Sequence, residues 1–406
     1  RQLTSRGQKI LYTAFVLFFY LYNGYGIGYR IGVYERFPVM YIVFLITLSL
    51  SYWLFLLVFR KEMRVAQEGT IPLIQRLFGN PLFAYITIGM YFATWLVRLV
   101  YPEFKLPLLI NPPAPDVIGE FLGRFTAPPD AVTKLVSNAG FLLFPFFLIA
   151  VMRYRRNMLI FALLIFVPYY IKYCINSYIS RGEVLAALFL VMGVQWYYNE
   201  KMRKYLIVGV LVILPFLPAM LVQYQDIRLQ QGADLYIDNQ DAIKMLVFSE
   251  TNFPIYSDKV IRSGKHIDLN RYFIWMVTLP IPKAIIGSVN APSAGMEMSE
   301  ILLEKKQGRK GFFALLAGLL TESTYIYGTK WYFLHALFLG GLMAFIARLT
   351  ENQDILFCVF LMLVVDLSYR LNRAGIAPVL GVVVNMYFSL YVLFFLGYLK
   401  RRIKWA

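Results

Sequence analysis

Long apolar segments recur along almost the whole chain, and they restrict its fold more than any other feature. Several hold roughly 18 or more nearly uncharged residues, enough to cross about 30 Å of hydrocarbon as a helix. Hydrophobic residues make up 59% of the sequence, whereas soluble domains contain about 45–50%. Backbone polar groups inside a bilayer must be bonded within the protein, which favours helices. The sequence therefore predicts an all-α polytopic integral membrane protein with a single membrane domain over residues 1–406.

The apolar segments give about ten predicted transmembrane helices. They cover residues 10–26, 39–59, 81–100, 132–151, 158–174, 184–198, 205–222, 329–347, 355–369 and 377–399. Lysine and arginine in short connections mark the cytoplasmic side of a membrane protein. The basic clusters "RKEMR", "RYRR", "NEKMRK" and "KRRIKWA" fall in alternate connections, which predicts that both termini are cytoplasmic.

One large external loop, residues 223–328, lies between the seventh and eighth predicted spans. Met298, Ile301 and Leu302 stand at helical spacing within 293–311, which predicts a short amphipathic helix on the outer leaflet. Residues 311–328 are apolar over too short a stretch to span, and Glu322 interrupts them. We interpret this segment as re-entrant or surface-lying, non-spanning and packed in protein. The alternative is that part of it extends the eighth span outward.

The net charge of +17 is compatible with a membrane surface or an anionic substrate. Nucleic acid is excluded as a partner, because the basic residues are spread between hydrophobic spans. Cys174 and Cys358 both lie in apolar runs, where cysteine acts as a small buried hydrophobe. With two histidines in the chain and no cluster of cysteine and histidine, no metal site and no cofactor are predicted.

Basic residues also gather at the external ends of the predicted spans, against the positive-inside tendency. They are Arg98, Lys172, Arg181, Arg370 and Arg373, joined from the large loop by Arg262, Arg271 and Lys283. The planar arginine side chain forms paired, charge-assisted hydrogen bonds to phosphate and keeps its charge. Such a cluster suits a phosphate carried on a lipid, and it would stabilise a leaving pyrophosphate.

Structural roles stay open for single members of this cluster. Arg181 could pair with Glu183 or extend to the membrane interface. Asp366 and Arg370, at i and i+4, fit a common helix-surface pair. The functional interpretation therefore rests on the group of arginines and not on any one of them.

Glu322 is the carboxylate with the strongest claim to chemistry. It follows a glycine-containing apolar run and precedes "STYIYG", which predicts a place at the boundary of water and lipid. Partial desolvation makes a carboxylate a better base toward a sugar hydroxyl. Glu322 is thus a candidate base or acceptor-orienting group, and the alternative is a structural partner for an arginine. We interpret His266 as solvent-exposed and His335 as packed within a span.

The layout resembles the bacterial oligosaccharide repeat-unit polymerases, the Wzy-type O-antigen and capsule polymerases. Three features carry the resemblance: "SRGEVLAALFL" (180–190), the one large external loop, and "LLTESTYIYGTKWYFLHALFLGGLMA" (319–344). The last is similar to that family's glutamate–aromatic–glycine motif, with Glu322, Tyr325 and Gly328 at the matching positions. "FIWMVTLPIPKAIIG" (273–287) is similar to a proline-containing basic stretch. It departs from the family in having Lys283, where an arginine often follows the proline.

The resemblance implies a metal-independent membrane glycosyltransferase with a glycosyltransferase-C-like fold in the bacterial cytoplasmic (inner) membrane. At the outer, periplasmic face, a growing glycan would move from undecaprenyl pyrophosphate onto a new lipid-linked repeat unit, as in lipopolysaccharide and other polysaccharide biosynthesis. A flippase and a chain-length regulator are the implied partners. The expected glycan- and pyrophosphate-binding residues are Arg181, Arg271, Lys283, Arg370 and Arg373, with Glu322 catalytic and Tyr325 lining the site.

Two alternatives remain at this point. An O-antigen ligase uses the same donor and is expected to carry an arginine and a histidine in the large loop, which His266 with Arg262 or Arg271 would supply. A flippase or transporter of the lipid-linked oligosaccharide is the alternative from another class. Transporters usually show inverted repeats and interrupted helices near the midplane, whereas the charges in this chain collect at one membrane face.

Overall fold

The apolar segments of the sequence are helical wherever the structure describes them. The computed structural model describes residues 2–25, 27, 33–96, 131–174, 181–213, 253–278, 294–306, 318–351 and 353–403. Within these ranges no strand occurs. Each predicted spanning segment contains a helix in its described part, which confirms the all-α class.

Two helices in the described part of the chain are long and apolar enough to cross a membrane. One is α2 (Phe37–Gly79), and the other is the Val379–Ile403 part of α19. Shorter apolar helical stretches cover Ala139–Tyr154, Met158–Tyr170, Leu185–Tyr198 and Phe333–Leu349. The two long helices support a membrane protein, while the larger number of crossings stays a prediction.

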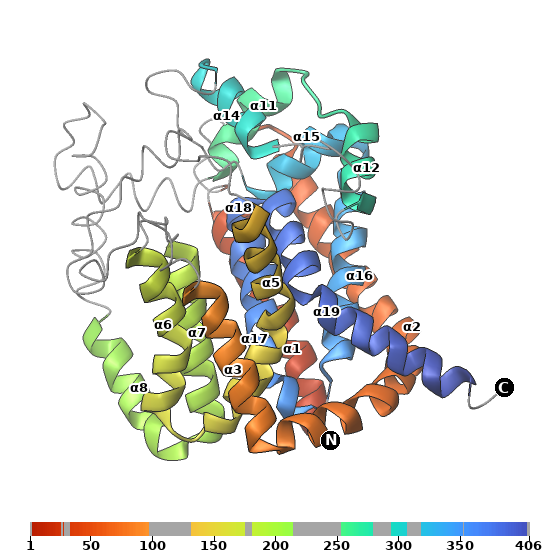
Figure 1. Ribbon diagram of the computed structural model, residues 1–406. Coiled ribbons are helices and arrows are strands. Elements are labelled where there is room, and N and C mark those ends of the chain that lie inside the picture. Colours follow the sequence, from red (N-terminus) through yellow and green to blue (C-terminus); the bar gives the residue numbers. More distant parts are fainter. Residues whose placement is uncertain are drawn as a thin grey trace. The chain divides into compact units, whose positions relative to one another are not determined.

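The chain divides into two compact units, which consist of Arg1–Thr70, Val247–Gln353 and Leu363–Ala406 (unit 1) and of Ile71–Leu246 and Asp354–Met362 (unit 2). Unit 1 contains α1 (Gln2–Phe19), η1 (Tyr20–Gly24), η6 (Phe253–Tyr256), α11 (Ser257–Arg262), α12 (Leu269–Thr278), α14 (Ala294–Leu303), α15 (Leu319–Trp331), α16 (Phe333–Leu349), η8 (Asp366–Arg370), α18 (Leu371–Ala374) and α19 (Ile376–Ile403) (Figure 1). Unit 2 contains α3 (Pro81–Leu96), α5 (Ala131–Val151), η5 (Met152–Tyr154), α6 (Met158–Cys174), α7 (Arg181–Tyr198), α8 (Glu200–Ile213) and η7 (Asp354–Leu356). Two helices, α2 and α17 (Phe357–Val365), have residues in both units.

The core of unit 2 is built from aromatic and sulfur contacts. Helices α3 and α5 pack together, and the rings of Tyr91 and Phe147 stack with centroids 4.1 Å apart. Cys358 is fully buried, with its Sγ 2.9 Å from the Sδ of Met152. The predicted role of Cys358 as a buried hydrophobe is confirmed, whereas the side chain of Cys174 lies outside the described residues.

The helix α2 runs straight through one predicted connection. The cluster "RKEMR" (60–64) was expected to be a cytoplasmic loop, but it is helical and continues to Gly79. The expectation is wrong because lysine, glutamate, methionine and arginine are good helix formers, and no proline occurs between Val39 and Pro72. Proline has no N–H to offer the carbonyl four residues earlier. The Arg401 guanidinium donates to that carbonyl, on Glu68, at 3.2 Å.

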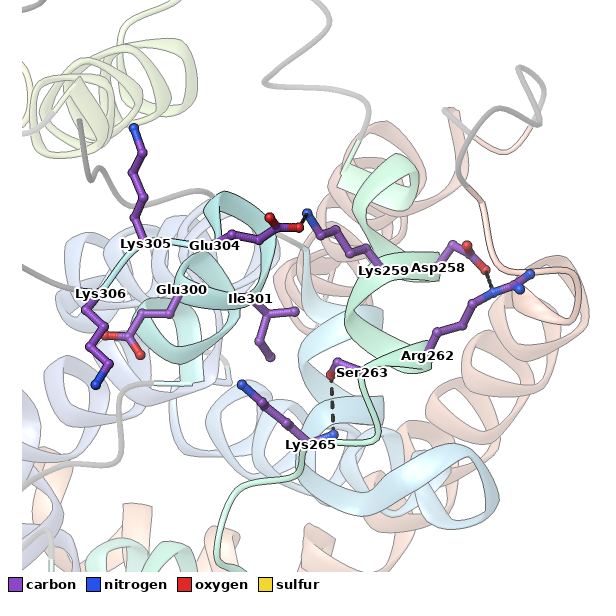
Figure 2. A pocket seen from close by; sticks show the side chains of 10 residues that line it. All are labelled: Asp258, Lys259, Arg262, Ser263, Lys265, Glu300, Ile301, Glu304, Lys305 and Lys306. Atoms are coloured by element: carbon purple, nitrogen blue, oxygen red, sulfur yellow. Dashed lines mark hydrogen bonds and ion pairs between the residues drawn. The ribbon is translucent and has the colours of Figure 1, made fainter. Parts of the chain in front are cut away.

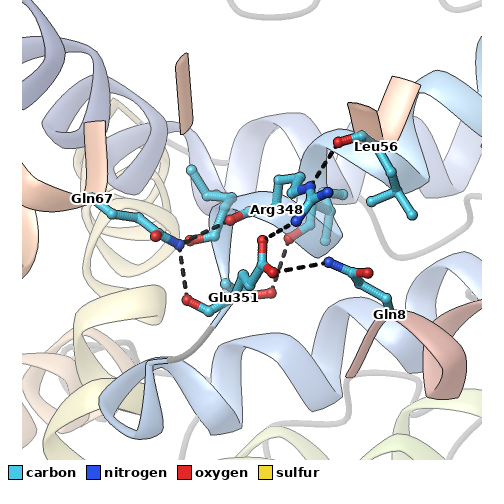
Figure 3. Close-up of polar contacts among 8 residues, drawn as sticks. Gln8, Leu56, Gln67, Arg348 and Glu351 are labelled. Carbon is cyan, nitrogen blue, oxygen red and sulfur yellow. Dashed lines mark hydrogen bonds and ion pairs between the residues drawn. The ribbon is translucent and has the colours of Figure 1, made fainter. Parts of the chain in front are cut away.

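A polar network joins α1, α2 and the C-terminal end of α16 in unit 1 (Figure 3). Arg348 donates from Nε to the Leu56 carbonyl at 2.8 Å and from Nη1 to Glu351 Oε2 at 2.6 Å. Gln8 donates to the other oxygen of Glu351 at 3.1 Å. The Gln67 amide nitrogen lies 2.9–3.1 Å from the carbonyls of Arg348, Leu349 and Glu351, at and just past the end of α16, where helical partners run out. Side chains thus complete the hydrogen bonding of this helix end.

We expect Glu351→Gln to destabilise the protein far more than Glu68→Gln. The Arg348 and Glu351 side chains are 11% and 18% exposed, so loss of the charge leaves a mostly buried guanidinium poorly compensated, at about 1–3 kcal/mol. Glu68 pairs with Arg64 where the side chains are 50% and 80% exposed, and such pairs contribute about 0–1 kcal/mol. Thermal unfolding in detergent measures both changes. Equal shifts in Tm would contradict the argument.

Helices α2 and α19 cross at a point where neither carries a side chain. A Cβ on Gly69 would lie 2.7 Å from the Gly397 carbonyl carbon, and a Cβ on Gly397 would lie 3.1 Å from the Thr70 nitrogen. Small residues allow such close backbone approach between membrane helices. The crossing therefore depends on both glycines.

We predict that Gly397→Ala lowers stability while Gly381→Ala does not. A methyl group at 397 collides with the Thr70 hydroxyl, which donates to the Leu393 carbonyl, and presses on the Thr70 backbone nitrogen, at about 1–3 kcal/mol for overpacking. Gly381 lies on the same helix with nothing within 4 Å of an added Cβ, so alanine there gains helix propensity of about 1 kcal/mol. The measurement is the apparent Tm of each purified variant. A Gly397→Ala protein as stable as the original would exclude the close contact of α2 and α19 at Gly69 and Gly397.

Candidate functional site

The first two turns of α15 carry polar side chains that the structure buries. Residues 319–326 all lie in the interior. Ser323 donates to the Leu319 carbonyl at 2.7 Å, and Thr324 donates to the Thr321 carbonyl at 2.8 Å. The described part of 311–328 is therefore packed in protein, as predicted. Gly328, at φ 73°, breaks the helix before α16 begins. How this segment meets the membrane stays a prediction.

The Glu322 carboxylate binds the N-terminal end of α19. Its side chain is 2% exposed, and Oε2 accepts a hydrogen bond of 2.8 Å from the Ile376 N–H. Helix N-termini favour negative charge, because their N–H groups are unpaired and the helix dipole is positive there. Glu322 is thus more deeply buried than a boundary position predicts, and it joins two segments 54 residues apart in sequence.

Gly375 makes this contact possible. Its φ of 88° lies in the left-handed region, where side chains with a Cβ are disfavoured. A Cβ at this position would also lie 2.8 Å from the carboxyl carbon of Glu322. The residue that separates α18 from α19 is therefore restricted to glycine for two independent reasons.

The two predicted C-terminal arginines lie directly before this glycine. Arg370 closes the π-helical turn η8, and Arg373 lies in α18, which contacts α15. Arg370 Nη1 donates to Asp366 Oδ1 at 2.8 Å. The i,i+4 pair is confirmed, but it is not a surface pair, because Asp366 is 1% exposed. The fold thus brings the Arg370–Arg373 segment next to the helix that carries Glu322.

Tyr325 connects α15 to α14. Its hydroxyl donates to Glu297 Oε2 at 2.9 Å, and its carbonyl accepts from the Ile267 N–H at 3.3 Å. The side chain is 4% exposed. Burial, followed by the Glu297 hydrogen bond, raises the pKa of Tyr325. In this structure Tyr325 holds two neighbouring segments against α15.

Two more aromatic residues lie near Glu322, Tyr272 on α12 and Tyr327 on α15. The Asp268 carboxylate accepts from the N–H groups of Asn270 at 2.9 Å and Arg271 at 3.3 Å, which caps the helix start. The Arg271 side chain is exposed. Tyr272 is fully buried, and burial together with the nearby Glu322 carboxylate raises its pKa. The same two causes raise the pKa of Tyr327 to about 12.

Two predicted site residues cannot be placed beside Glu322. The side chain of Arg181 lies outside the described residues, although the backbone of this residue begins α7. Lys283 lies outside them altogether. His266, in the predicted loop, is exposed, as predicted. His335 is fully buried, and its Nδ1 lies 2.8 Å from Ser323 Oγ.

Asn23 belongs to the site but was missed in the sequence. It lies in the π-helical turn η1 and is fully buried, and its Oδ1 accepts from the Leu320 N–H at 3.1 Å. It thereby caps α15 from another helix. An asparagine at the end of an apolar run was the only sequence signal. π-helical turns are rare and often occur at functional sites, and both η1 and η8 lie beside α18.

Buried polar atoms without a hydrogen-bond partner in the described structure occur on the elements around α15. They are Asn23 Nδ2, Tyr272 Oη, Thr321 Oγ1, His335 Nε2, Asp366 Oδ2 and Asn372 Oδ1. Native interiors pair nearly all such groups. The region around α15 therefore holds more unpaired buried donors and acceptors than a native interior normally does.

Within the described residues, no three side chains of histidine, cysteine, aspartate or glutamate gather where they could hold a metal ion. No protein-family model matches the chain, and comparison with curated proteins and with solved structures finds no significant match. The function must therefore be argued from the residues themselves.

Gly375→Ala is expected to be more harmful than Gly264→Ala. Both glycines have positive φ, 88° and 64°, and alanine in that conformation loses about 1–2 kcal/mol. At Gly264 nothing lies within 4 Å of an added Cβ, whereas at Gly375 the Glu322 carboxylate does. The difference between the two apparent Tm values isolates the collision. No difference would mean that Glu322 is not held against this backbone.

Proposed function

We propose that this protein is a membrane glycosyltransferase that polymerises lipid-linked oligosaccharide repeat units. A hydroxyl of the incoming lipid-linked repeat attacks the anomeric carbon of the growing glycan. A glycosidic C–O bond forms, and the C–O bond to polyprenyl pyrophosphate breaks. The pyrophosphate-bearing lipid leaves with the bonding electron pair, and the hydroxyl proton passes to a carboxylate.

The observation that carries this proposal is the hydrogen bond of the Glu322 carboxylate to the start of α19, next to α18. A carboxylate and two arginines, Arg370 and Arg373, belong to segments that are far apart in sequence and adjacent in the fold. Arginine donors would stabilise negative charge as it develops on the leaving pyrophosphate. Arg370 has further N–H groups besides the one that Asp366 accepts.

Glu322 is the group we assign to the hydroxyl proton. The Ile376 N–H fixes one carboxylate oxygen, so the carboxylate has a defined orientation before a substrate binds, which is what general-base catalysis requires. Because the side chain is 2% exposed, the acceptor hydroxyl reaches it only after neighbouring side chains move aside. The surplus buried donors and acceptors around α15 would serve sugar hydroxyl groups.

The location of the reaction follows from the predicted topology. With both termini cytoplasmic and about ten spans, the α11–α15 region faces the outside of a bacterial inner membrane. The substrates are polyprenyl-pyrophosphate-linked saccharides held among membrane lipids. A flippase would supply the repeat unit, and a chain-length regulator would limit the product. Arg181, Arg271 and Lys283 are proposed to assist at the pyrophosphate.

We predict that Glu322→Gln abolishes chain elongation without loss of the protein from the membrane. Glutamine keeps the size of the side chain and an oxygen for the Ile376 N–H, but it is a much weaker base. Arg373→Lys keeps the charge but loses the planar pair of donors, and we expect elongation to fall about 100-fold or more, the usual effect of losing one such donor. The readout is the ladder of surface polysaccharide lengths on a gel, from cells that carry only the variant.

Glu297→Gln is the matched control, since it neutralises a carboxylate that also contacts α15 but through Tyr325. It should leave the ladder in place. Single repeat units on the surface of Glu322→Gln cells would support a polymerase. Loss of every surface saccharide would instead indicate a ligase or a flippase. A ladder of normal length at normal protein levels would overturn the assignment of Glu322.

A further inference from the structure

A cavity of about 680 Å³ lies between α11 and α14, apart from the buried Glu322 site (Figure 2). Ligand sites for small molecules commonly occupy about 300–1,000 Å³. The lining comes from α11, the turn after it, and the end of α14 with the residues up to Lys306 that follow. Nothing in the proposed chemistry at Glu322 uses these residues.

The lining is almost entirely charged, with basic residues in excess. Five lining residues are lysine or arginine and three are aspartate or glutamate, a difference of two positive charges. Lys259 pairs with Glu304 at 2.8 Å, and Arg262 pairs with Asp258 at 2.6 Å. The other three cations are Lys265, Lys305 and Lys306, which have no ion pair in the described structure. The third acidic lining residue is Glu300.

The turn after α14 is held in an unusual conformation that places two of these lysines. Glu304 is the one residue other than glycine with positive φ, 54°, among the described residues. Lys259 from α11 donates to the Leu302 carbonyl at 3.1 Å and pairs with Glu304, and its hydrogen bond lowers the pKa of Glu304. Strained backbone of this kind persists where surrounding contacts fix it, often at ligand sites. Because these contacts hold the end of α14 to α11, Lys305 and Lys306 line the cavity.

We propose that this cavity binds an acidic saccharide, through carboxylate or phosphate groups on the sugar chain. The inference rests on the proposed function, because it makes the cavity a subsite for the glycan and makes negatively charged repeat units the preferred substrate. Lys265, Lys305 and Lys306 contact the anionic groups. The carboxylate of Glu300 accepts hydrogen bonds from sugar hydroxyls.

The composition of the lining separates a saccharide from other anions. Ile301 is the single apolar residue among the ten that line the cavity, so there is no wall against which a lipid acyl chain could pack. No aromatic residue lines it, whereas single-stranded nucleic acids are bound by stacking on aromatic rings. Lysines bind negative groups and carboxylates accept hydrogen bonds from hydroxyls, so this lining best fits an anion that carries many hydroxyl groups.

The cavity is connected to the Glu322 site through the helices that form it. Both α11 and α14 contact α15, and the Tyr325 hydroxyl on α15 donates to Glu297 of α14. A glycan held between α11 and α14 would therefore be anchored to the same helix that carries Glu322. This arrangement would let the cavity select the charge of the chain that enters the reaction.

The test is a binding measurement on the full-length protein in nanodiscs of zwitterionic lipid. The probe is a hyaluronan tetrasaccharide, which carries carboxylates, and the neutral comparator is a chitin tetrasaccharide. We expect the acidic probe alone to bind, with affinity that falls when salt is raised from about 0.05 to about 0.5 M, because screening weakens exposed charge pairs. The variant Lys265→Gln/Lys305→Gln/Lys306→Gln should weaken binding about tenfold or more, since charge-assisted contacts are lost.

The matched control is Lys61→Gln/Lys201→Gln/Lys204→Gln, which removes three exposed lysines elsewhere and should bind like the original protein. Arginine at the three cavity positions should restore binding. Equal affinity for both saccharides, or equal loss in both triple variants, would overturn the proposal. Displacement of the probe by phosphatidylglycerol in the nanodisc, but not by free inorganic phosphate, would assign the cavity to lipid headgroups and overturn it too. The polymerase proposal stands separately, because Glu322→Gln tests elongation and not binding at this cavity.

Discussion

The hydrogen bond from the Ile376 N–H to the Glu322 carboxylate holds α15 against the first residue of α19, and much of unit 1 is arranged around that contact. Asn23 caps the start of α15 from η1, and Tyr325 ties the same helix to α14. Residues from four distant parts of the sequence therefore take their positions from one short buried helix. If the carboxylate were displaced, α15 would lose its hydrogen bond to the residue that follows the Arg370–Arg373 segment and Gly375.

A cluster of buried polar groups is costly unless each group finds a partner. The interior of unit 1 contains Asn23, Glu322, His335 and Asp366 at 0–2% exposure, beside aromatic contacts such as Phe18 with Tyr369. Packing optimised for stability alone would place hydrophobic residues there. The buried polar residues and the two π-helical turns therefore lower stability, a cost that is expected if this part of the fold carries the proposed chemistry.

The sequence was sufficient for the helical class, because long apolar runs leave no other regular structure available in a membrane. It failed at 60–64, where a basic cluster indicated a loop and helix-forming side chains continued the helix. The contact of Glu322 with Gly375 could not be read from a single sequence, since no local pattern relates residues so far apart. A helix end at Gly375 could be predicted, because a glycine followed closely by Pro378 is typical of a helix end and a new start. Its contact with Glu322 could not.

Helix α2 has 43 residues, about 64 Å at the usual rise per residue, which is roughly twice the hydrocarbon thickness of a membrane. Pro72 lies two residues beyond the point where unit 1 ends within this helix. A proline bend normally exposes an unbonded carbonyl, but Arg401 of α19 already satisfies the one on Glu68. The backbone hydrogen bond that Pro72 cannot make is therefore replaced by a side chain 333 residues further along the chain, so a chain cut before Arg401 would leave that carbonyl unbonded.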